Sequence, residues 1–407
     1  MQDAYALEQR IVPAVIKMES SGVKISCEIL AAREKWEKRF EIGDQYLRNV
    51  VGDIKLGGKL MFNTLRAKGV IDETKIVYTK KGNPRYGKDF LPYLIKDKKL
   101  KSILVDRSRM QKVIGTYLKP WSEAYKRNGR FYPYFNQIRN EEDYGTMTGR
   151  FSSNFQQVPR PDEGTLVNLR RFIEPDDGDV IIQRDYSGQE LRIAAHYAEG
   201  DVLQRFQSDP NFDMHTWVQQ EIYELSGVML DRKTHVKQIG FLKLYGGGPK
   251  ALHEKYNVSL EDAHSFFKLF DKAVPEFKAL SKELEDQVRS GVLLRTWGGR
   301  LYNVEPSKYI DGKFKEFYYK LTNILIQGSA ADMMKYAIAN YYHNPERTGR
   351  IMLTVHDELV VSCKPKFVKS EMKLLKTCME TLPGWDLQIL SDGKVGANFG
   401  DLEDYED

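Results

Sequence analysis

The spacing of apolar residues along this chain switches several times between the period of a helix and the period of a strand. Apolar residues three and four positions apart predict helices over residues 28–50, 189–207, 313–342 and 365–382, within 5–27 before a short strand, and over most of 213–290. Apolar runs and strict alternation predict strands over residues 179–187 and in two hairpins, 293–304 and 349–363.

The predicted strands lie on both sides of a long helical block. The first hairpin turns at Gly298-Gly299, and the second turns within residues 356–358. Strands this far apart in sequence are expected to form one sheet with a helical insertion between them. The pattern therefore predicts an α+β fold rather than a row of independent domains.

The composition is that of an ordinary globular protein, with 41% apolar and 29% charged residues in a chain of 407. No apolar run approaches the length of about 18 residues that a membrane-spanning helix needs. The first residues lack the basic-then-apolar pattern of a signal peptide. Cys27, Cys363 and Cys378 are far apart in sequence and match no metal motif. We expect a cytoplasmic protein without membrane contact.

Positive charge is concentrated in one part of the chain. The net charge is only +5, yet residues 80–130 hold fifteen Lys and Arg against four acids. A basic segment on a mildly acidic body indicates that a polyanion is gripped at one place. A solvated helix face explains the same charges equally well.

Two acidic positions stand where predicted strands end. Asp185 follows the apolar run 180–182, with Glu190 five residues later, and Asp357 lies in the turn of the second hairpin beside Glu358. Polar edging of ordinary turns is one interpretation. The other is a hard-oxygen site for Mg²⁺, which prefers one or two carboxylates together with waters and phosphates.

The helix predicted after Asp231 has two cations and an aromatic residue on one face. Lys233, Lys237 and Phe241 follow each other at four-residue intervals, and a glycine triplet ends the helix. Such a face suits a triphosphate with its base covered by the ring. A basic amphipathic helix with a packed Phe is the alternative.

Together these motifs resemble the family A DNA polymerases, the bacterial DNA polymerase I type. "DYSGQELR" (185–192) and "VHDE" (355–358) are similar to the two palm motifs of the family, and "RKTHVKQIGFLKLYGG" (232–247) is similar to its fingers-helix motif. Further matches follow in family order, namely "IVPAVIKMESSGVKIS" (11–26), "TGRFSSNFQQVP" (148–159), "DMHT" (213–216) and "NILIQGSAADMMK" (323–335). The resemblance covers nearly the whole chain.

The resemblance implies a right-hand fold with an antiparallel palm sheet, helical fingers and a helical thumb. The expected parts are a palm-associated segment (1–27), the thumb (28–145), the first part of the palm (146–205), the fingers (206–320) and the second part of the palm (321–407). The implied activity is template-directed addition of dNTPs to a primer 3′-hydroxyl with release of pyrophosphate.

The resemblance also assigns roles at the reaction centre. Asp185, Asp357 and the backbone carbonyl of Tyr186 would hold two Mg²⁺ ions, with Mn²⁺ able to substitute, and Glu358 is a secondary third carboxylate. Lys237 would contact the α- and β-phosphates and act in catalysis.

The remaining implied contacts belong to the nucleotide and the DNA. Glu190 would occupy the space that a ribose 2′-hydroxyl needs, beside Gln189. The other nucleotide contacts are His215, Arg232, Lys233, Phe241 and Tyr245. The primer–template contacts are Arg150, Gln156, Asn323, Gln327 and His356, for which a buried polar residue or a helix cap is the alternative.

Some residues depart from the family pattern, and this affects what can be expected. Gly188-Gln189 replaces the usual Gln-Ile beside the sugar gate, and Lys233 stands where the family has Arg. The proofreading exonuclease that usually precedes residue 11 is expected to be absent. We expect a monomer, with replisome or processivity partners left open and a phage origin suggested by the motif variants.

Two rival functions remain open at this point. A single-subunit RNA polymerase shares the same plan, although Glu190 argues against it. A degenerate polymerase that only binds DNA would require a lost carboxylate or lysine, whereas Asp185, Asp357 and Lys237 are all present.

Overall fold

The computed structural model describes residues 3–79, 81–87, 90–139, 145–159, 167–256, 258–310 and 312–406. Lys80, Lys88 and Asp89, three charges of the basic segment, lie outside the described residues, as do residues 140–144 at the end of the expected thumb. Within the described residues, no helix is both long enough and apolar enough to cross a membrane.

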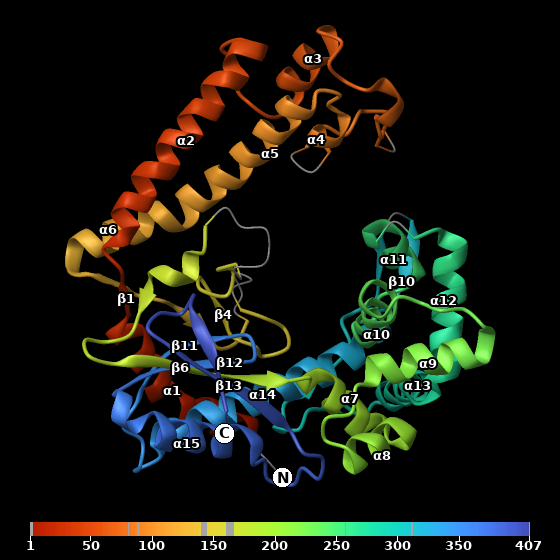
Figure 1. The fold of residues 1–407 in the computed structure, drawn as a ribbon. Helices are drawn as coiled ribbons and strands as arrows, with labels where there is room; N and C mark the ends of the chain where they lie inside the picture. Colours follow the sequence, from red (N-terminus) through yellow and green to blue (C-terminus); the bar gives the residue numbers. More distant parts are fainter. Residues whose placement is uncertain are drawn as a thin grey trace.

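A five-stranded antiparallel sheet lies at the centre of the molecule (Figure 1). Its order is β11 (Arg350–Val355), β12 (Glu358–Cys363), β6 (Val180–Ser187), β13 (Leu390–Gly396) and β14 (Leu402–Tyr405). The predicted strand 179–187 and the second predicted hairpin are therefore neighbours, which confirms a sheet built from distant segments. Strand β13, on the other side of β6, was not predicted, because "LSDGKVG" has no apolar alternation.

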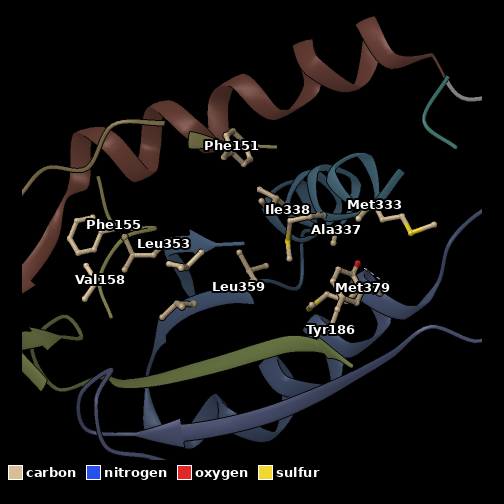
Figure 2. Packing of buried hydrophobic residues seen from close by; sticks show 14 of the residues in the cluster. Phe151, Phe155, Val158, Tyr186, Met333, Ala337, Ile338, Leu353, Leu359 and Met379 are labelled. Carbon is tan, nitrogen blue, oxygen red and sulfur yellow. Dashed lines mark hydrogen bonds between the residues drawn. The ribbon is translucent and has the colours of Figure 1, made fainter. Parts of the chain in front are cut away.

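Three helices pack beneath this sheet, namely α1 (Ala4–Ser21), α14 (Leu321–His343) and α15 (Val368–Glu380). Helix α14 is buried on nearly all its faces, as expected of a helix that crosses a protein core. Figure 2 shows Met333, Ala337 and Ile338 of α14 in one buried cluster with Leu353 and Leu359 of the sheet. Helix α14 and the sheet therefore share one hydrophobic core, which holds the strands in place.

Two long helices form an arm on one side of the sheet (Figure 1). Helix α2 (Glu28–Val51) packs along α5 (Lys98–Val113), and α6 (Lys119–Asn128) joins the arm to the body. The far end, with the short helices α3 (Lys59–Ala67) and α4 (Leu91–Leu94), has an apolar cluster of its own around Phe62. The arm is therefore a folded unit with its own core.

A helical lobe made of residues 200–320 lies on the opposite side of the sheet (Figure 1). Its helices are α8 (Gly200–Ser208), α9 (Met214–Ser226), α10 (Lys237–Leu244), α11 (Pro249–Tyr256), α12 (Leu260–Ala273) and α13 (Pro275–Arg289). Helix α7 (Gln189–Ala198) leads into the lobe from β6. The single helix predicted over 189–207 is wrong, because Glu199 and Gly200 adopt positive φ (55° and 76°) and break it into α7 and α8.

The helix predicted over 313–342 is also wrong in its first turns. Residues Lys313–Lys315 form strand β10, which pairs with β9 (Lys308–Ile310), and α14 begins only at Leu321. The first predicted hairpin is confirmed as β7 (Leu294–Arg295) and β8 (Leu301–Tyr302).

Short strands connect the arm to the body. Strand β1 (Val23–Ile25) pairs with β2 (Arg130–Phe131) and β5 (Ile173–Glu174), and β3 (Phe135–Asn136) pairs with β4 (Ser152–Ser153).

A buried ionic cluster ties the helical lobe to the helices beneath the sheet. Asp332 of α14, fully buried, accepts hydrogen bonds from Thr296 Oγ1 and from Arg300 Nη2 (2.9 Å). Glu8 of α1 accepts from Arg300 and from Lys335, which are both largely buried. Burial opposes the charge on Arg300, but attraction to Asp332 and Glu8 outweighs it and raises the pKa of that guanidinium.

We expect Asp332→Ala to lower the free energy of unfolding by about 3–5 kcal/mol, because it leaves a buried guanidinium without its main counter-charge. Guanidinium chloride unfolding followed by circular dichroism measures the change. Asp53→Ala is the matched control, since that carboxylate is 96% exposed and pairs only at the surface with Arg48. Equal effects of the two substitutions would contradict the role given to the cluster.

Candidate active site

The sheet brings the two expected carboxylates together at one end of its strands, where β6 approaches its last residues and β12 begins; this end is called the sheet edge below. Asp185 in β6 is the register partner of Glu358 in β12, and the Tyr186 N–H donates to the Asp357 carbonyl at 3.2 Å. Asp357 stands in a two-residue turn after β11, and its neighbour His356 adopts a positive φ of 58°. Such a conformation costs a non-glycine residue about 1–2 kcal/mol, so the turn geometry is imposed by the paired strands.

Glu358 faces the interior rather than the open edge. Its side chain is 1% exposed, and its carboxylate accepts hydrogen bonds from Arg170 Nη1 (3.2 Å) and from the Gln183 amide. Arg170 in turn lies over the Phe399 ring at 4.5 Å. Glu358 therefore fixes the start of β12 beside Asp185.

Tyr186 offers only its backbone to the site. Its ring is 4% exposed, and its hydroxyl donates to the Met379 carbonyl of α15 at 3.0 Å (Figure 2). Burial raises the pKa of this phenol far above its usual range. The side chain thus holds β6 onto α15 and points away from Asp185.

A cavity of about 700 Å³ opens between the sheet edge and the helical lobe. Ten of the residues expected at the site line it, namely Arg150, Gln189, Glu190, His215, Arg232, Lys237, Phe241, Tyr245, His356 and Asp357. The acidic sheet edge thus faces cations of the lobe across this cavity.

Glu190 is held in the cavity wall by two neighbours. One carboxylate oxygen accepts a hydrogen bond from Arg150 Nη2, and the other accepts from the Tyr245 hydroxyl. Burial, and then the charge of Glu190, raises the pKa of Tyr245, so this phenol stays protonated and can donate. Gln327 also hydrogen-bonds Tyr245. The acid therefore has a fixed position at the start of α7.

The helix that carries Lys237 begins with a wide turn, and this changes which residues face the cavity. Asp231 caps it by accepting from the N–H groups of Lys233 and Thr234, as predicted. The first turn, Arg232–Val236, is a π-helix, in which the Lys237 N–H donates to the Arg232 carbonyl five residues earlier. The wide turn brings Arg232 to the cavity, whereas the expected contact Lys233 is not among the lining residues.

Arg232 and His215 are positioned by one acid at the start of α9. Asp213 caps that helix at the His215 N–H (3.0 Å) and accepts from Arg232 Nη2 (2.6 Å). Burial, reinforced by the nearby charges of Arg232 and Lys237, lowers the pKa of His215 to about 4 in spite of Asp213. The imidazole is therefore neutral at pH 7.

Lys237 and Phe241 lie one helical turn apart on α10, with the Lys237 Nζ 5.9 Å from the Phe241 ring centre. The Phe241 ring stacks with Tyr245 at 5.8 Å and neighbours His215 at 5.9 Å. Lys237 forms no ion pair with any residue that the structure describes. A cation and a row of rings thus line one wall of the cavity.

Three of the expected DNA contacts lie outside the cavity lining. The Gln156 amide donates to the Phe151 carbonyl, while Asn323 and Gln327 lie one turn apart on α14. Sequence reasoning missed Arg192, which lines the cavity and donates to the Gln388 carbonyl (3.0 Å). Its position in the motif "DYSGQELR" pointed to the site. Its contact could not be predicted, because the residue that it binds is far away in sequence.

The donors at the sheet edge match the needs of Mg²⁺. Asp185, Asp357 and the Tyr186 carbonyl are all hard oxygen ligands. In the parts of the chain that the structure describes, no three His, Cys, Asp or Glu side chains gather to enclose a metal. A site with few protein ligands leaves room for waters and for substrate phosphates, as Mg²⁺ requires.

Comparisons with known proteins agree with this geometry. Residues 33–401 match the family model described as DNA polymerase family A. DNA polymerase I of Caldicellulosiruptor bescii is 25% identical over 97% of this chain and 46% of its own length. The thermostable DNA polymerase I of Thermus aquaticus is 26% identical over 92% of this chain and 45% of its own length. The DNA polymerase of Bacillus phage SP01 is 26% identical, with shares of 92% and 46%.

A solved structure shares the fold. The polymerase domain of Pol1 from M. smegmatis, in complex with a DNA primer-template and dNTP, superposes with a TM-score of 0.80 at 20% identity, covering 97% of this chain and 70% of that one. This confirms the expected right-hand fold with an antiparallel sheet. The chain spans less than half the length of the three curated relatives. Because the family model matches most of its residues, the chain belongs to DNA polymerase family A.

Proposed function

We propose that this chain is a DNA-directed DNA polymerase that adds dNTPs to the 3′-hydroxyl of a primer and releases pyrophosphate. The observation that carries the proposal is the cavity with Asp357 on one wall, beside Asp185, and Lys237, Arg232 and His215 on the other. Acidic metal ligands opposite phosphate-binding cations suit phosphoryl transfer.

The proposed parts of the hand follow the expected boundaries. The sheet with residues 1–27, 146–205 and 321–407 is the palm, residues 28–145 are the thumb and residues 206–320 are the fingers. The arm and the helical lobe on opposite sides of the sheet support this division (Figure 1). The basic arm helix α5 would hold duplex phosphates, so affinity for primer–template DNA is expected to fall with salt.

Asp185, Asp357 and the Tyr186 carbonyl would hold two Mg²⁺ ions, while Glu358 keeps β12 in place. When bound, such ions supply a lowered pKa for the attacking hydroxyl and charge stabilisation for the departing phosphates. The chain itself contributes orientation, because β6 and β12 hold both acids at one edge of a rigid sheet. The hydroxyl and the α-phosphate would meet there.

The lobe side of the cavity would bind the nucleotide. Lys237 would contact the α- and β-phosphates, and neutral His215 would donate a hydrogen bond to the β-phosphate. Arg232, whose fork suits phosphate oxygens, takes the outer contact ahead of Lys233. Phe241 and Tyr245 would pack against the sugar and the templating position.

The primer–template minor groove would lie against Arg150, Gln156, Asn323, Gln327 and His356. Hydrogen-bond acceptors recur in the minor groove at every correct base pair, so donors there can test pairing without reading sequence. Arg150 lines the cavity and donates to Glu190, which would couple the groove contact to the sugar contact.

Primer extension with Mg²⁺ tests the proposal directly. We expect dNTP-dependent, template-directed extension of a matched primer, little rNTP incorporation, and no removal of a mismatched 3′ nucleotide. Extension with rNTPs alone would favour an RNA polymerase. DNA binding without extension would favour a degenerate module, and mismatch removal would contradict the expected lack of proofreading.

We expect Asp185→Ala and Asp357→Ala each to reduce extension at least ~10³-fold, since charge stabilisation at a metal site is worth several kcal/mol. Primer–template affinity, measured by fluorescence anisotropy, should stay within about threefold, because phosphate contacts dominate it. Asp404→Ala, at an 86% exposed carboxylate on β14, is the control. Normal extension by either active-site variant would refute the assignment.

We expect Glu190→Ala to reduce the preference for dNTP over rNTP by about 10- to 100-fold, because it opens space for the 2′-hydroxyl. The ratio of the two kcat/KM values is the measurement, since loss of the Arg150 and Tyr245 contacts should also slow dNTP use. Tyr245→Phe keeps the carboxylate and removes one hydrogen bond, so its ratio should remain close to wild type. An unchanged ratio in Glu190→Ala would show that another residue excludes the ribose.

We expect the His215 imidazole to titrate near pH 4 in the free protein, because burial and two cations disfavour its protonated form. NMR titration, with His215→Asn to assign the resonance, measures this. Binding of a dNTP should raise the pKa, since a triphosphate favours the imidazolium. The protonated form is disfavoured only in the folded chain, so this group should destabilise the fold progressively as pH falls from 6.5 towards 4. A titration midpoint of 6.5 in the free protein would contradict the buried position.

A further inference from the structure

The β9–β10 hairpin of the helical lobe has two chemically different faces. Register pairs place Tyr309 opposite Phe314 on one face, and Lys308 opposite Lys315 on the other. Strand alternation puts Lys313 on the lysine face as well. All five side chains are exposed, and Figure 1 shows β10 in the lobe on the same side of the sheet as α10.

The aromatic face is open to solvent. Tyr309 is 76% exposed and Phe314 is 58% exposed, and their ring centres are 5.4 Å apart. Two large adjacent rings on a short hairpin bury too little surface to serve as a core. An open aromatic pair of this kind indicates a binding surface.

The lysine face indicates what the partner is. No ion pair among the described residues involves Lys308, Lys313 or Lys315, whereas the neighbouring Glu316 is engaged by Arg289 at 3.0 Å. The hairpin segment 308–315 carries three lysines against one acid, Asp311, which lies outside the described residues, so its net charge is positive. Exposed rings together with lysines that form no ion pair among the described residues match the bases and phosphates of single-stranded nucleic acid.

Two aromatic residues, the buried Phe317 and the exposed Tyr319, lie between the lysine face of the hairpin and the rim of the cavity. The Phe317 ring lies 5.2 Å from Lys308 Nζ and 6.3 Å from the ring of Tyr319, which is 54% exposed. Tyr319 packs directly on Gly246. A Cβ atom added to Gly246 would lie 2.2 Å from the carbonyl oxygen of Tyr319. Gly246 follows Tyr245, which lines the cavity.

We propose that the hairpin binds the unpaired template strand that leads into the cavity. Bases stack on the Tyr309–Phe314 pair, and the long lysine side chains extend past the edge of the hairpin to the phosphates, so that the strand reaches Tyr245 past Tyr319. The proposal rests on the polymerase function above and adds to it a site for the single strand.

The double variant Tyr309→Ala/Phe314→Ala tests this site. Two labelled primer–templates are compared by anisotropy, one with a template overhang of one nucleotide and one with an overhang of about ten, a length typical of single-strand sites. Wild type should bind the long overhang more tightly. The variant should lose about tenfold in affinity for the long overhang, as expected for lost stacking, and under about twofold for the short one.

Matched variants distinguish a loss of base stacking from misfolding and from a loss of nonspecific apolar binding. Tyr309→Phe/Phe314→Tyr keeps both rings and should retain the preference for the long overhang. Tyr223→Ala/Met229→Ala removes exposed apolar groups elsewhere in the lobe (48% and 62% exposed) and should leave it unchanged. Lys313→Gln/Lys315→Gln should reduce the salt dependence of long-overhang binding.

The outcomes are distinguishable from failure of the polymerase proposal. Extension of the short-overhang substrate by wild type tests the polymerase function, and the double variant should match it there. Equal affinity of wild type for the two overhangs, or an unchanged preference in the double variant, would overturn the hairpin proposal while leaving polymerase activity intact.

Discussion

The pairing of β6 with β12 is the constraint on which the rest of the site depends. Its register sets Asp185 opposite Glu358, and the bond from the Tyr186 N–H to the Asp357 carbonyl closes the same edge. A slip of one residue would turn every side chain of the strand to the other face. The apolar residues beneath the sheet prevent such a slip, because they would lose their contacts with α14 and α15 (Figure 2). Core packing thus fixes the spacing of the acids.

The sequence predicted this edge because both strands carry a strong local pattern, and it predicted less where the pattern misleads. Phe314, Phe317 and Leu321 have helical spacing, yet the chain forms the β9–β10 hairpin before α14 begins. Gly312 at φ 74° permits the turn, and pairing with β9, which local periodicity does not reveal, decides the outcome. Strand β13 was missed for a related reason, since its backbone bonds to β6 hold a polar segment in place.

Residue roles were harder to predict than elements, because they depend on contacts between distant segments. Spacing of four residues favoured Lys233 as the partner of Lys237, but the π-turn at the start of this helix brings Arg232 to the cavity instead. Asp213 then holds Arg232 from a different helix. The sequence pointed to Arg232, Lys233 and Lys237 as candidate cations, and the structure brings two of them, Arg232 and Lys237, to the cavity. The π-turn, whose hydrogen bond spans five residues instead of four, decides which of these cations faces the cavity.

The engagement of Glu358 determines how much negative charge the sheet edge presents. Of the three acids that the sequence places here, Glu358 is the one that Arg170 and Gln183 bind in the interior, so Asp185 and Asp357 are the two expected to act as metal ligands. Three carboxylates turned to one point would repel each other strongly and would favour a fully enclosed cation. Two carboxylates would leave coordination positions on the cation for water and for phosphate. The buried ion pair therefore favours a site that would share its cations with a substrate, as the proposed phosphoryl transfer requires.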